Sequence, residues 1–360
     1  MTTSVLVIGA GVVGLACAQA LSKLGFEVVI AEKAKEIASE ASSRNSGVIH
    51  AGIYYKAESQ KQIHCLAGRK LLYEYCRNFG ISFNKTGKLI VASDEAELSQ
   101  LISIKKNAEL CSVNLSLISS SSVKELEPEL EVAGALLSHE TGIVNVGELC
   151  NSLLFEAEAH GALLALNTEV TRLQNVGRKV LVQSETTSDN NELEFDYVVN
   201  AAGLGAHKLI HRSVDYMLRP PKLFAKGNYF SVSGSAPFSR LVYPVPEKDG
   251  LGIHYTLDTQ GNCYLGPDVE WVEAPNYHVD LSREIKFRQN VKKYWPGIED
   301  RTLNAAYAGV RPKINIGDFV FHRDKNILSL LGIESPGVTS SLSIAASVKD
   351  VLLDHFEWQV

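Results

Sequence analysis

The 360-residue sequence lacks several features that mark particular classes of protein. Its 35 Lys and Arg against 41 Asp and Glu give a net charge of −6, and no concentrated basic stretch is present. A nucleic-acid partner is therefore not expected, because phosphate binding needs such a stretch. No apolar run of about 20 residues is available to cross a bilayer as a helix. We expect a soluble protein without a transmembrane segment, and peripheral contact with a membrane stays open.

The spacings of a metal centre are also missing. The 6 cysteines are spread over the whole length without a Cys-x-x-Cys pair, and no histidines cluster at ligand spacing. We therefore predict no metal site. The cysteines are expected to be reduced, packed thiols in a cytoplasmic protein, and contact with the periphery of the inner membrane is left open.

What is present is a composition that can bury a large core. Hydrophobic residues make up 45% of the chain and charged residues 21%, which excludes a disordered chain. Single cores stop growing near roughly 250–300 residues, so two domains are expected. Patterns of buried strand and helix occur at the start, middle and end of the chain. The predicted fold class is α/β with an α+β insertion: a discontinuous Rossmann-like domain and a domain with an antiparallel sheet.

The N-terminal segment carries the pattern of a dinucleotide-binding site. Ser4–Ile8 is a short apolar run typical of a buried parallel strand, and Gly9, Gly11 and Gly14 follow it at G-x-G-x-x-G spacing. Backbone N–H groups at the start of the following helix can hold a pyrophosphate. Glu32 ends the second predicted strand, where its carboxylate can accept hydrogen bonds from ribose hydroxyls. The alternative is a glycine-rich turn that serves packing alone.

Two further segments suit a flat ligand. Residues 42–55, SSRNSGVIHAGIYY, combine small hydroxyls, an amide and two glycines, so the chain can pass close to a ligand and donate hydrogen bonds. Residues 331–341, LGIESPGVTSS, run through a Pro-Gly turn into the terminal helix, whose N-terminus would stabilise negative charge on the pyrimidine edge of a flavin. An ordinary loop and a helix cap at Thr339 or Ser340 are the respective alternatives.

Together these motifs resemble a known family. GAGVVG with Glu32, SSRNSGVIHAGIYY, GIHYT with LGPD, AGVRP and GIESPGVTSS are similar to the FAD-dependent D-amino-acid-oxidase superfamily, most closely to its L-2-hydroxyglutarate dehydrogenase/oxidase branch. The resemblance covers the chain from end to end. It implies FAD as cofactor, a discontinuous FAD-binding domain over residues 1–85, 142–215 and 304–360, and a substrate-binding domain over residues 86–141 and 216–303.

The resemblance also implies which residues contact FAD. Val170 is expected on the adenine side, Ala201–Gly203 along the dinucleotide, and Gly332 with the start of the terminal helix at the isoalloxazine. The predicted FAD-binding residues are Gly9, Gly11, Val12, Val13, Gly14, Glu32, Lys33, Ser43, Arg44, Asn45, Ser46, Gly47, Val48, Val170, Ala201, Ala202, Gly203, Gly332, Gly337, Val338, Thr339 and Ser340.

The implied reaction is oxidation of a small 2-hydroxy acid, L-2-hydroxyglutarate to 2-oxoglutarate, by hydride transfer from C2 to flavin N5. Superfamily members place an arginine against the substrate carboxylate, and Arg311 in AGVRP stands at that position. A guanidinium suits this role because it binds a carboxylate bidentately. The branch usually has FRGEYY-like and GVRAQ-like segments where this chain has AKGNYF and GVRPK, so the arginine is kept while its surroundings differ.

Two histidines are candidates for the base that removes the hydroxyl proton, because an unperturbed imidazole pKa near about 6.5 suits proton transfer at neutral pH. His50 and His254 both lie in motifs expected near the flavin, and the sequence ranks neither above the other. Tyr243 and Tyr255 are expected to orient the hydroxyl or carboxylate, and Lys226 is the candidate for a distal carboxylate. Ordinary sheet tyrosines and a solvated lysine are the alternatives.

Two other functions stay open on the sequence alone. The same flavin and arginine would support an amine oxidase that acts on glycine or a D-amino acid. A non-catalytic flavin-binding protein is the alternative of another class. The sequence does not indicate the electron acceptor (oxygen, a quinone or a protein), the oligomeric state or whether the flavin is attached covalently.

Overall fold

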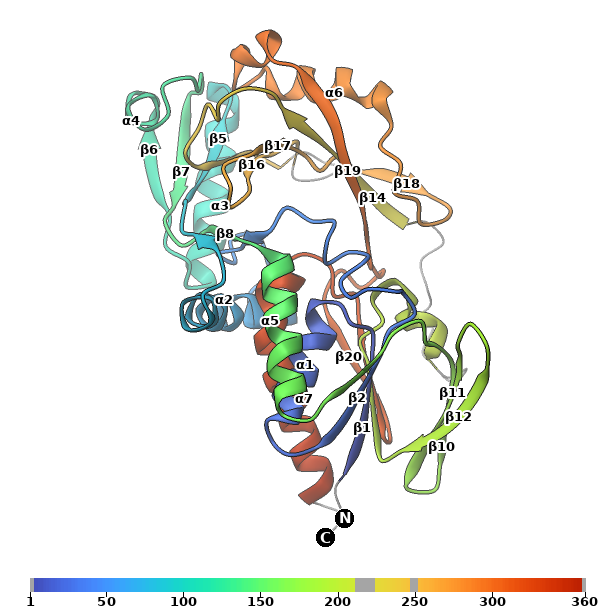
Figure 1. Ribbon diagram of the computed structural model, residues 1–360. Coiled ribbons are helices and arrows are strands. Elements are labelled where there is room, and N and C mark those ends of the chain that lie inside the picture. Colours follow the sequence, from blue (N-terminus) through green and yellow to red (C-terminus); the bar gives the residue numbers. More distant parts are fainter. Residues whose placement is uncertain (1–2, 211–223, 247–251, 358–360) are drawn as a thin grey trace.

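The computed structural model describes residues 3–210, 224–246 and 252–357. Its elements form two units, one below the other in Figure 1. The lower unit contains the N-terminal strands and the terminal helix, and the upper unit contains a second sheet with its flanking helices. The predicted domain border between residues 215 and 216 lies outside the described residues.

The lower unit is built on a six-stranded sheet of order β20-β21-β13-β1-β2-β9. All neighbours are parallel except the edge strand β20, which pairs antiparallel with β21. The strands are β1 (Ser4–Ile8), β2 (Glu27–Ala31), β9 (Leu163–Ala165), β13 (Tyr197–Asn200), β20 (Val320–Asp324) and β21 (Ile327–Leu331). The predicted Rossmann-like fold is confirmed.

Both faces of this sheet are covered, which explains the unbroken apolar run in β1. Val5 and Val7 pack among the helices, whereas Leu6 and Ile8 pack against a small antiparallel sheet. The helices are α1 (Val12–Ser22), α2 (Gln60–Phe79), α5 (Val146–Ala159) and α7 (Gly337–Glu357). The small sheet is β10 (Glu169–Val176), β11 (Lys179–Glu185) and β12 (Asn190–Phe195). Because alternate side chains of a strand point to opposite faces, each one finds apolar neighbours.

The upper unit contains a nine-stranded sheet of order β18-β14-β17-β16-β15-β5-β7-β6, with β19 also paired to β14. Its strands are β5 (Lys88–Ala92), β6 (Ser116–Ser119), β7 (Gly134–Ser138), β14 (Phe224–Val232), β15 (Leu241–Pro244), β16 (Tyr255–Leu257), β17 (Cys263–Leu265), β18 (Glu270–Val272) and β19 (Leu303–Arg311). Helices α3 (Leu98–Leu110), α4 (Ser120–Leu126) and α6 (Glu284–Val291) flank it. A short sheet of β3 (Val48–Ile49), β8 (Gly142–Val144) and β4 (Phe83–Asn84) lies between the units.

The structure corrects two expectations about this sheet. It is not purely antiparallel, because β15 runs parallel to β5. These strands belong to separate insertions, so no tight hairpin forces them to run in opposite directions. Strand β19 pairs with β14 over nearly its whole length and therefore belongs to this sheet. The expected border at residues 303 and 304 cuts through the start of β19, and the second unit extends to Arg311 instead.

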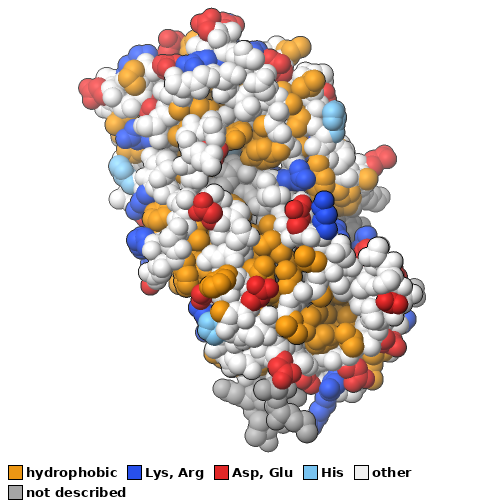
Figure 2. Space-filling view, in the orientation of Figure 1, with side chains coloured by type: hydrophobic (Ala, Val, Ile, Leu, Met, Phe, Trp, Pro, Cys, Tyr) orange, Lys and Arg blue, Asp and Glu red, His pale blue; other side chains and the backbone are white. Residues whose placement is uncertain are grey.

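The surface fits the balanced charge of the sequence. On the face in Figure 2, acidic and basic side chains are interspersed, and hydrophobic side chains gather in patches between them. Among the helices of the described chain, none is long and apolar enough to cross a membrane. All 6 cysteines are unpaired and buried.

Candidate active site

A cavity of about 400 Å³ extends from the carboxyl ends of the parallel strands to the sheet of the upper unit. That is the size range of small-molecule sites. Most of the predicted FAD-binding residues line it: Gly9, Gly11, Val12, Val13, Glu32, Lys33, Arg44, Asn45, Ser46, Val48, Val170, Ala201, Ala202, Gly203, Gly337 and Val338. His50, His254, Tyr243 and Arg311 line it as well. The fold thus brings together segments that are far apart in the sequence.

The glycines at the start of α1 create space for a ligand and for the helix itself. Gly9 has a φ of +98°, and a Cβ there would lie 2.8 Å from the Ala201 carbonyl oxygen. A Cβ on Gly14 would lie 1.9 Å from the Gly9 carbonyl oxygen, so Gly14 serves the packing of helix on strand and does not line the cavity. Gly11 caps α1 without a side chain, and the first turn carries no acidic residue. This helix start is suited to a pyrophosphate.

Glu32 is held rigidly beside these glycines. Its two carboxylate oxygens accept hydrogen bonds from the backbone N–H groups of Ala10, at 2.8 Å, and Ala34, at 2.9 Å. The side chain is only 8% exposed and lines the cavity. Each oxygen keeps a second lone pair, which can accept from a ribose hydroxyl.

The middle of the cavity has polar groups that await a ligand. Arg44 Nε and Tyr54 Oη are buried and have no hydrogen-bond partner among the described residues. The Arg44 guanidinium lies 4.4 Å from the centre of the Tyr277 ring. Buried polar atoms without partners are rare in folded proteins. Together with the glycine cradle, the unpaired Arg44 Nε fits a bound dinucleotide such as FAD.

The N-terminus of α7 reaches the other end of the cavity through Gly337 and Val338. Behind it, Thr339 Oγ1 accepts a hydrogen bond from His50 N at 3.0 Å and donates one to Val48 O at 3.2 Å. Helix α2 crosses closely here, because a Cβ on Gly68 would lie 2.3 Å from the Thr339 carbonyl oxygen. Thr339 therefore positions His50 without lining the cavity.

The remaining predicted FAD contacts are placed beside the cavity and do not line it. Ser43 Oγ donates to Glu40 O, and Gly47 N donates to Asn45 Oδ1. A Cβ on Gly332 would meet Ile314, and the buried Ser340 Oγ has no hydrogen-bond partner among the described residues. Their direct contact with FAD stays a prediction.

His50 is a neutral imidazole in this environment. Burial, reinforced by the positive charges of Lys88 and Arg311, lowers its pKa to about 3. Its Nε2 lies 3.2 Å from Ser335 Oγ, in the turn before α7. The neutral imidazole keeps one lone pair as an acceptor. It becomes an effective base when a bound anion offsets the charges of Lys88 and Arg311, which hold its pKa down without a ligand.

His254, directly before β16, belongs to a row of side chains that continues on the neighbouring strands β15 and β5. Its ring stacks on Tyr243 with a centroid distance of 3.5 Å, and Lys88 Nζ lies 4.3 Å from the centre of the Tyr243 ring. Tyr243 is on β15, which lies between β16 and β5. The tyrosine is thus held between the imidazole and the ammonium.

Arg311 ends β19 with its guanidinium open to a ligand. The side chain is 37% exposed, and its Nη1 lies 4.0 Å from Glu334 Oε2. Glu334 is paired more closely with Lys61, at 2.8 Å. The carboxylate therefore orients Arg311 without occupying its hydrogen-bonding edge.

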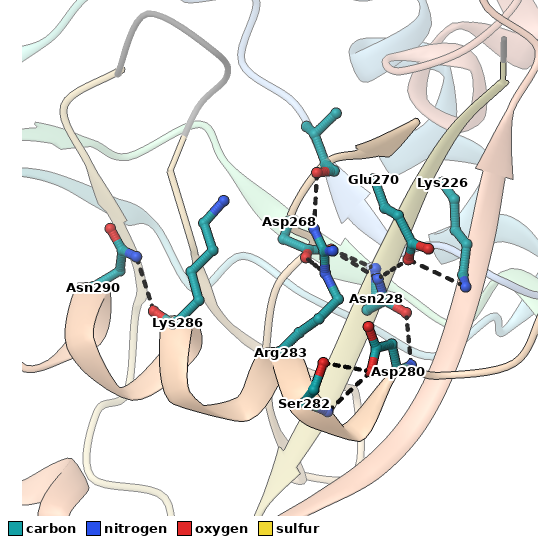
Figure 3. Close-up of polar contacts among 10 residues, drawn as sticks. Lys226, Asn228, Asp268, Glu270, Asp280, Ser282, Arg283, Lys286 and Asn290 are labelled. Carbon is teal, nitrogen blue, oxygen red and sulfur yellow. Dashed lines mark hydrogen bonds and ion pairs between the residues drawn. The ribbon is translucent and has the colours of Figure 1, made fainter. Parts of the chain in front are cut away.

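The structure places two predicted substrate residues elsewhere. Tyr255 follows His254 directly, so it points to the opposite face of the sheet, where its hydroxyl donates to Phe238 O at 3.3 Å. Lys226 is buried and pairs with Glu270 at 3.2 Å, in the polar network that Figure 3 shows around Asn228 and Arg283. Neither side chain lines the cavity.

Sequence reasoning missed several polar residues that line the cavity, which are Tyr54, Tyr55, Lys61, Tyr229 and Glu334. It also missed Lys88, which lies behind Tyr243. The two tyrosines end the motif of residues 42–55, so a signal for them was available. Lys61 and Lys88 carry no local sequence pattern. Only the fold pairs Lys61 with Glu334 and brings Lys88 close enough to affect the pKa of His50. No group of three or more His, Cys, Asp or Glu side chains in the described ranges is placed to hold a metal ion.

Comparison with known proteins identifies a family, a relative with a similar sequence and solved structures with a similar fold. A model of the FAD-dependent oxidoreductase family (DAO) matches residues 4–350. The chain is 37% identical to the mitochondrial L-2-hydroxyglutarate dehydrogenase of Arabidopsis thaliana, over 96% of this chain and 83% of the relative.

Solved structures with similar folds include a dithionite-reduced L-α-glycerophosphate oxidase from Mycoplasma pneumoniae with FAD bound. It has a TM-score of 0.85 and 26% identity, over 96% of this chain and 93% of that one. A glycine oxidase from Geobacillus kaustophilus has a TM-score of 0.84 and 21% identity, over 97% of this chain and 94% of that one, and it shows the fold alone.

Proposed function

The chain belongs to the family of FAD-dependent oxidoreductases, and from this premise we propose that it oxidises L-2-hydroxyglutarate to 2-oxoglutarate. Its cofactor is FAD. The observation that carries the proposal is the meeting of Arg311 and a neutral His50 at the α7 end of the cavity. A cation for a carboxylate and a base for a hydroxyl are what a 2-hydroxy acid requires.

The cofactor would be held mainly by main-chain groups. Gly9, Gly11 and the N-terminus of α1 would bind the pyrophosphate, and Glu32 the adenosine ribose. Gly337 and Val338 at the start of α7 would face the flavin. When bound, FAD supplies the two-electron oxidant that accepts a hydride from the substrate.

Arg311 would bind the carboxylate next to C2. Its planar guanidinium can donate two parallel hydrogen bonds, which fixes the carboxylate plane and with it the direction of the C2–H bond. The Lys61–Glu334 pair supports the guanidinium from the side. Orientation of this kind lowers the activation barrier because the reacting atoms are already positioned.

His50 is the proposed base. Its neutral imidazole would take the C2 hydroxyl proton at Nε2. This role requires the tautomer in which Nε2 accepts a hydrogen bond from the Ser335 hydroxyl before substrate binds. His254 covers one ring face of Tyr243, and we assign it a positioning role through that stacking. The sequence alone did not separate the two histidines; the hydrogen bond to the α7 turn favours His50.

The test is anaerobic bleaching of the purified holoprotein. Equal concentrations of L-2-hydroxyglutarate, sn-glycerol 3-phosphate and glycine are mixed with it, and loss of flavin absorbance is followed. We expect fast bleaching by L-2-hydroxyglutarate alone. Bleaching by glycine alone would indicate the amine oxidase, and tight flavin retention with no bleaching would indicate a non-catalytic flavoprotein. Oxygen, a quinone and candidate proteins are then added to the reduced holoprotein to identify the electron acceptor.

A glycerol phosphate is the second candidate substrate, because the glycerophosphate oxidase structure is 26% identical to this chain. Arg311 discriminates between the two. A 2-hydroxy acid carries its carboxylate on the reacting carbon, whereas the phosphate of glycerol 3-phosphate is one carbon and one oxygen further away. Bleaching by glycerol 3-phosphate alone would favour that candidate.

A further inference from the structure

Lys88 is a buried cation without an acidic partner. Its side chain is 1% exposed at the start of β5. Within the described part of the chain, no carboxylate forms an ion pair with its ammonium, although every other lysine or arginine at the cavity end near α7 has one. A charge is rarely buried unless another charge compensates it. The position therefore indicates a missing anion.

The ammonium lies directly behind two residues of the cavity wall. Lys88 Nζ is 4.3 Å from the ring centre of Tyr243 and 5.0 Å from that of Tyr54. Both tyrosines line the cavity. Their rings stabilise the cation in part. They do not satisfy its three N–H donors, which need oxygen or nitrogen acceptors.

Tyr54 provides a second, independent sign of a ligand at the same place. Its Oη is buried and has no hydrogen-bond partner among the described residues. The unpaired Tyr54 hydroxyl and the Lys88 ammonium, whose Nζ lies 5.0 Å from the centre of the Tyr54 ring, are complementary to one carboxylate group.

The charges around the cavity lead to the same conclusion. Lys61 is neutralised by Glu334 at 2.8 Å, and the same carboxylate is 4.0 Å from Arg311. Lys88 and Arg311 are then left as two positive charges around one pocket, and both lower the pKa of His50. A ligand with two negative charges would balance them, whereas a monocarboxylate would leave one uncompensated.

We propose that Lys88 and Tyr54 bind the second carboxylate of a dicarboxylic acid whose first carboxylate is held by Arg311. This assignment rests on the proposed function, because it takes a 2-hydroxy acid as the class of substrate. It makes Lys88 the residue that selects L-2-hydroxyglutarate over 2-hydroxy acids with an uncharged tail. Lys226, the candidate from the sequence, is already paired with Glu270.

The direct test compares two unreactive ligands of equal chain length, glutarate and pentanoate, on the holoprotein. Their dissociation constants are measured by calorimetry and by the change in flavin absorbance. The wild type is expected to bind glutarate roughly 10-fold or more tightly than pentanoate, as for a charge-assisted hydrogen bond. Lys88→Met should bring this ratio close to one. Lys85→Met, which removes an exposed lysine three residues earlier, is the matched control and should keep the wild-type ratio.

Steady-state kinetics of Lys88→Met distinguish a failure of the Lys88 assignment from a failure of the proposed function. In Lys88→Met, kcat/KM should fall for L-2-hydroxyglutarate and stay within a few-fold for L-2-hydroxypentanoate. If the wild type prefers glutarate, loses this preference in Lys88→Met and yet oxidises no hydroxy acid, the proposed function fails and Lys88 keeps its role. If L-2-hydroxyglutarate is oxidised and Lys88→Met keeps the glutarate preference, the Lys88 assignment is overturned alone.

A second variant keeps the test decisive if Lys88→Met does not retain flavin. Tyr54→Phe removes one hydroxyl and leaves the ring against the ammonium. It should lower the glutarate-to-pentanoate ratio by about 3- to 10-fold, the effect of one lost hydrogen bond to a charged group. An unchanged ratio in Tyr54→Phe would overturn the proposal.

Discussion

The two ends of the cavity are built in different ways. At the α1 end, the binding surface is main chain: glycines remove steric bulk, and Glu32 is fixed by two backbone N–H groups. At the α7 end it is made of side chains, namely His50, Tyr54 and Arg311, from segments far apart in the sequence. The first end should therefore tolerate almost no change in shape, whereas the second should respond in graded steps to changes in charge.

The strongest test of this contrast is Gly14→Ala. The new Cβ would lie 1.9 Å from the Gly9 carbonyl oxygen, so helix and strand must separate. Overpacking of this severity costs about 3 kcal/mol or more, and we expect protein without flavin. Flavin content is read from the absorbance spectrum. Gly147→Ala in α5 is the control, because its Cβ meets a single side-chain oxygen at 3.3 Å; normal flavin content in Gly14→Ala would contradict the steric argument.

At the other end, the largest effect is expected for His50→Gln. Loss of a general base lowers kcat by roughly 100- to 10,000-fold. Since the pKa of His50 is lowered to about 3, its neutral form dominates throughout the usual assay range. Its ionisation should therefore not reduce kcat/KM of the wild type between about pH 5 and pH 7. Wild-type kcat in His50→Gln would remove His50 from the chemistry.

A smaller effect is expected for Arg311→Met. Loss of a charge-assisted contact costs about 1.5–3 kcal/mol, which corresponds to roughly 10- to 150-fold in kcat/KM. Most of it should appear as a higher KM, with flavin content unchanged. Arg172→Met on the exposed surface of β10 is the matched control. Equal kinetics in both variants would show that Arg311 does not contact the substrate.

The smallest effect expected is a pH dependence of glutarate binding. Burial lowers the pKa of Lys88 to about 7, so its ammonium is lost as the pH rises through that value. Glutarate should therefore bind about 10-fold more weakly at pH 8 than at pH 6. Of the groups that face Lys88, His50 stays neutral because its pKa is lowered, and Tyr54, Tyr243 and Cys65 stay neutral because burial raises theirs. Lys88→Arg should remove the dependence, since a guanidinium stays charged; an unaltered slope would assign it to another group.

The same contrast explains what the sequence could predict. Strand β1 has the expected bounds, because a central parallel strand is apolar on both faces and is followed here by a glycine turn. Glu32 was identified because its place depends on spacing from those glycines. By contrast, the parallel pairing of β5 with β15 depends on two separate insertions meeting, which no local pattern records.

At the substrate end, prediction was limited by side-chain direction and by long-range placement. His254 and Tyr255 were both candidates, yet neighbours on an extended chain cannot line the same cavity, and only His254 does. Lys226 and Lys88 each belong to a strand and lie next to a glycine, so the local sequence does not distinguish them. The fold supplies Glu270 as partner to the former and two aromatic rings to the latter.

The tight crossing of α2 and α7 has a consequence for the evolution of activity. Any side chain at position 68 would push the two helices apart, and Thr339 would carry the peptide N–H of His50 with it. Turnover would then change although position 68 itself lines no part of the cavity. Substitutions along α2 thus offer natural selection, or an engineer, a way to adjust the turnover rate. The residues that bind the substrate stay unchanged.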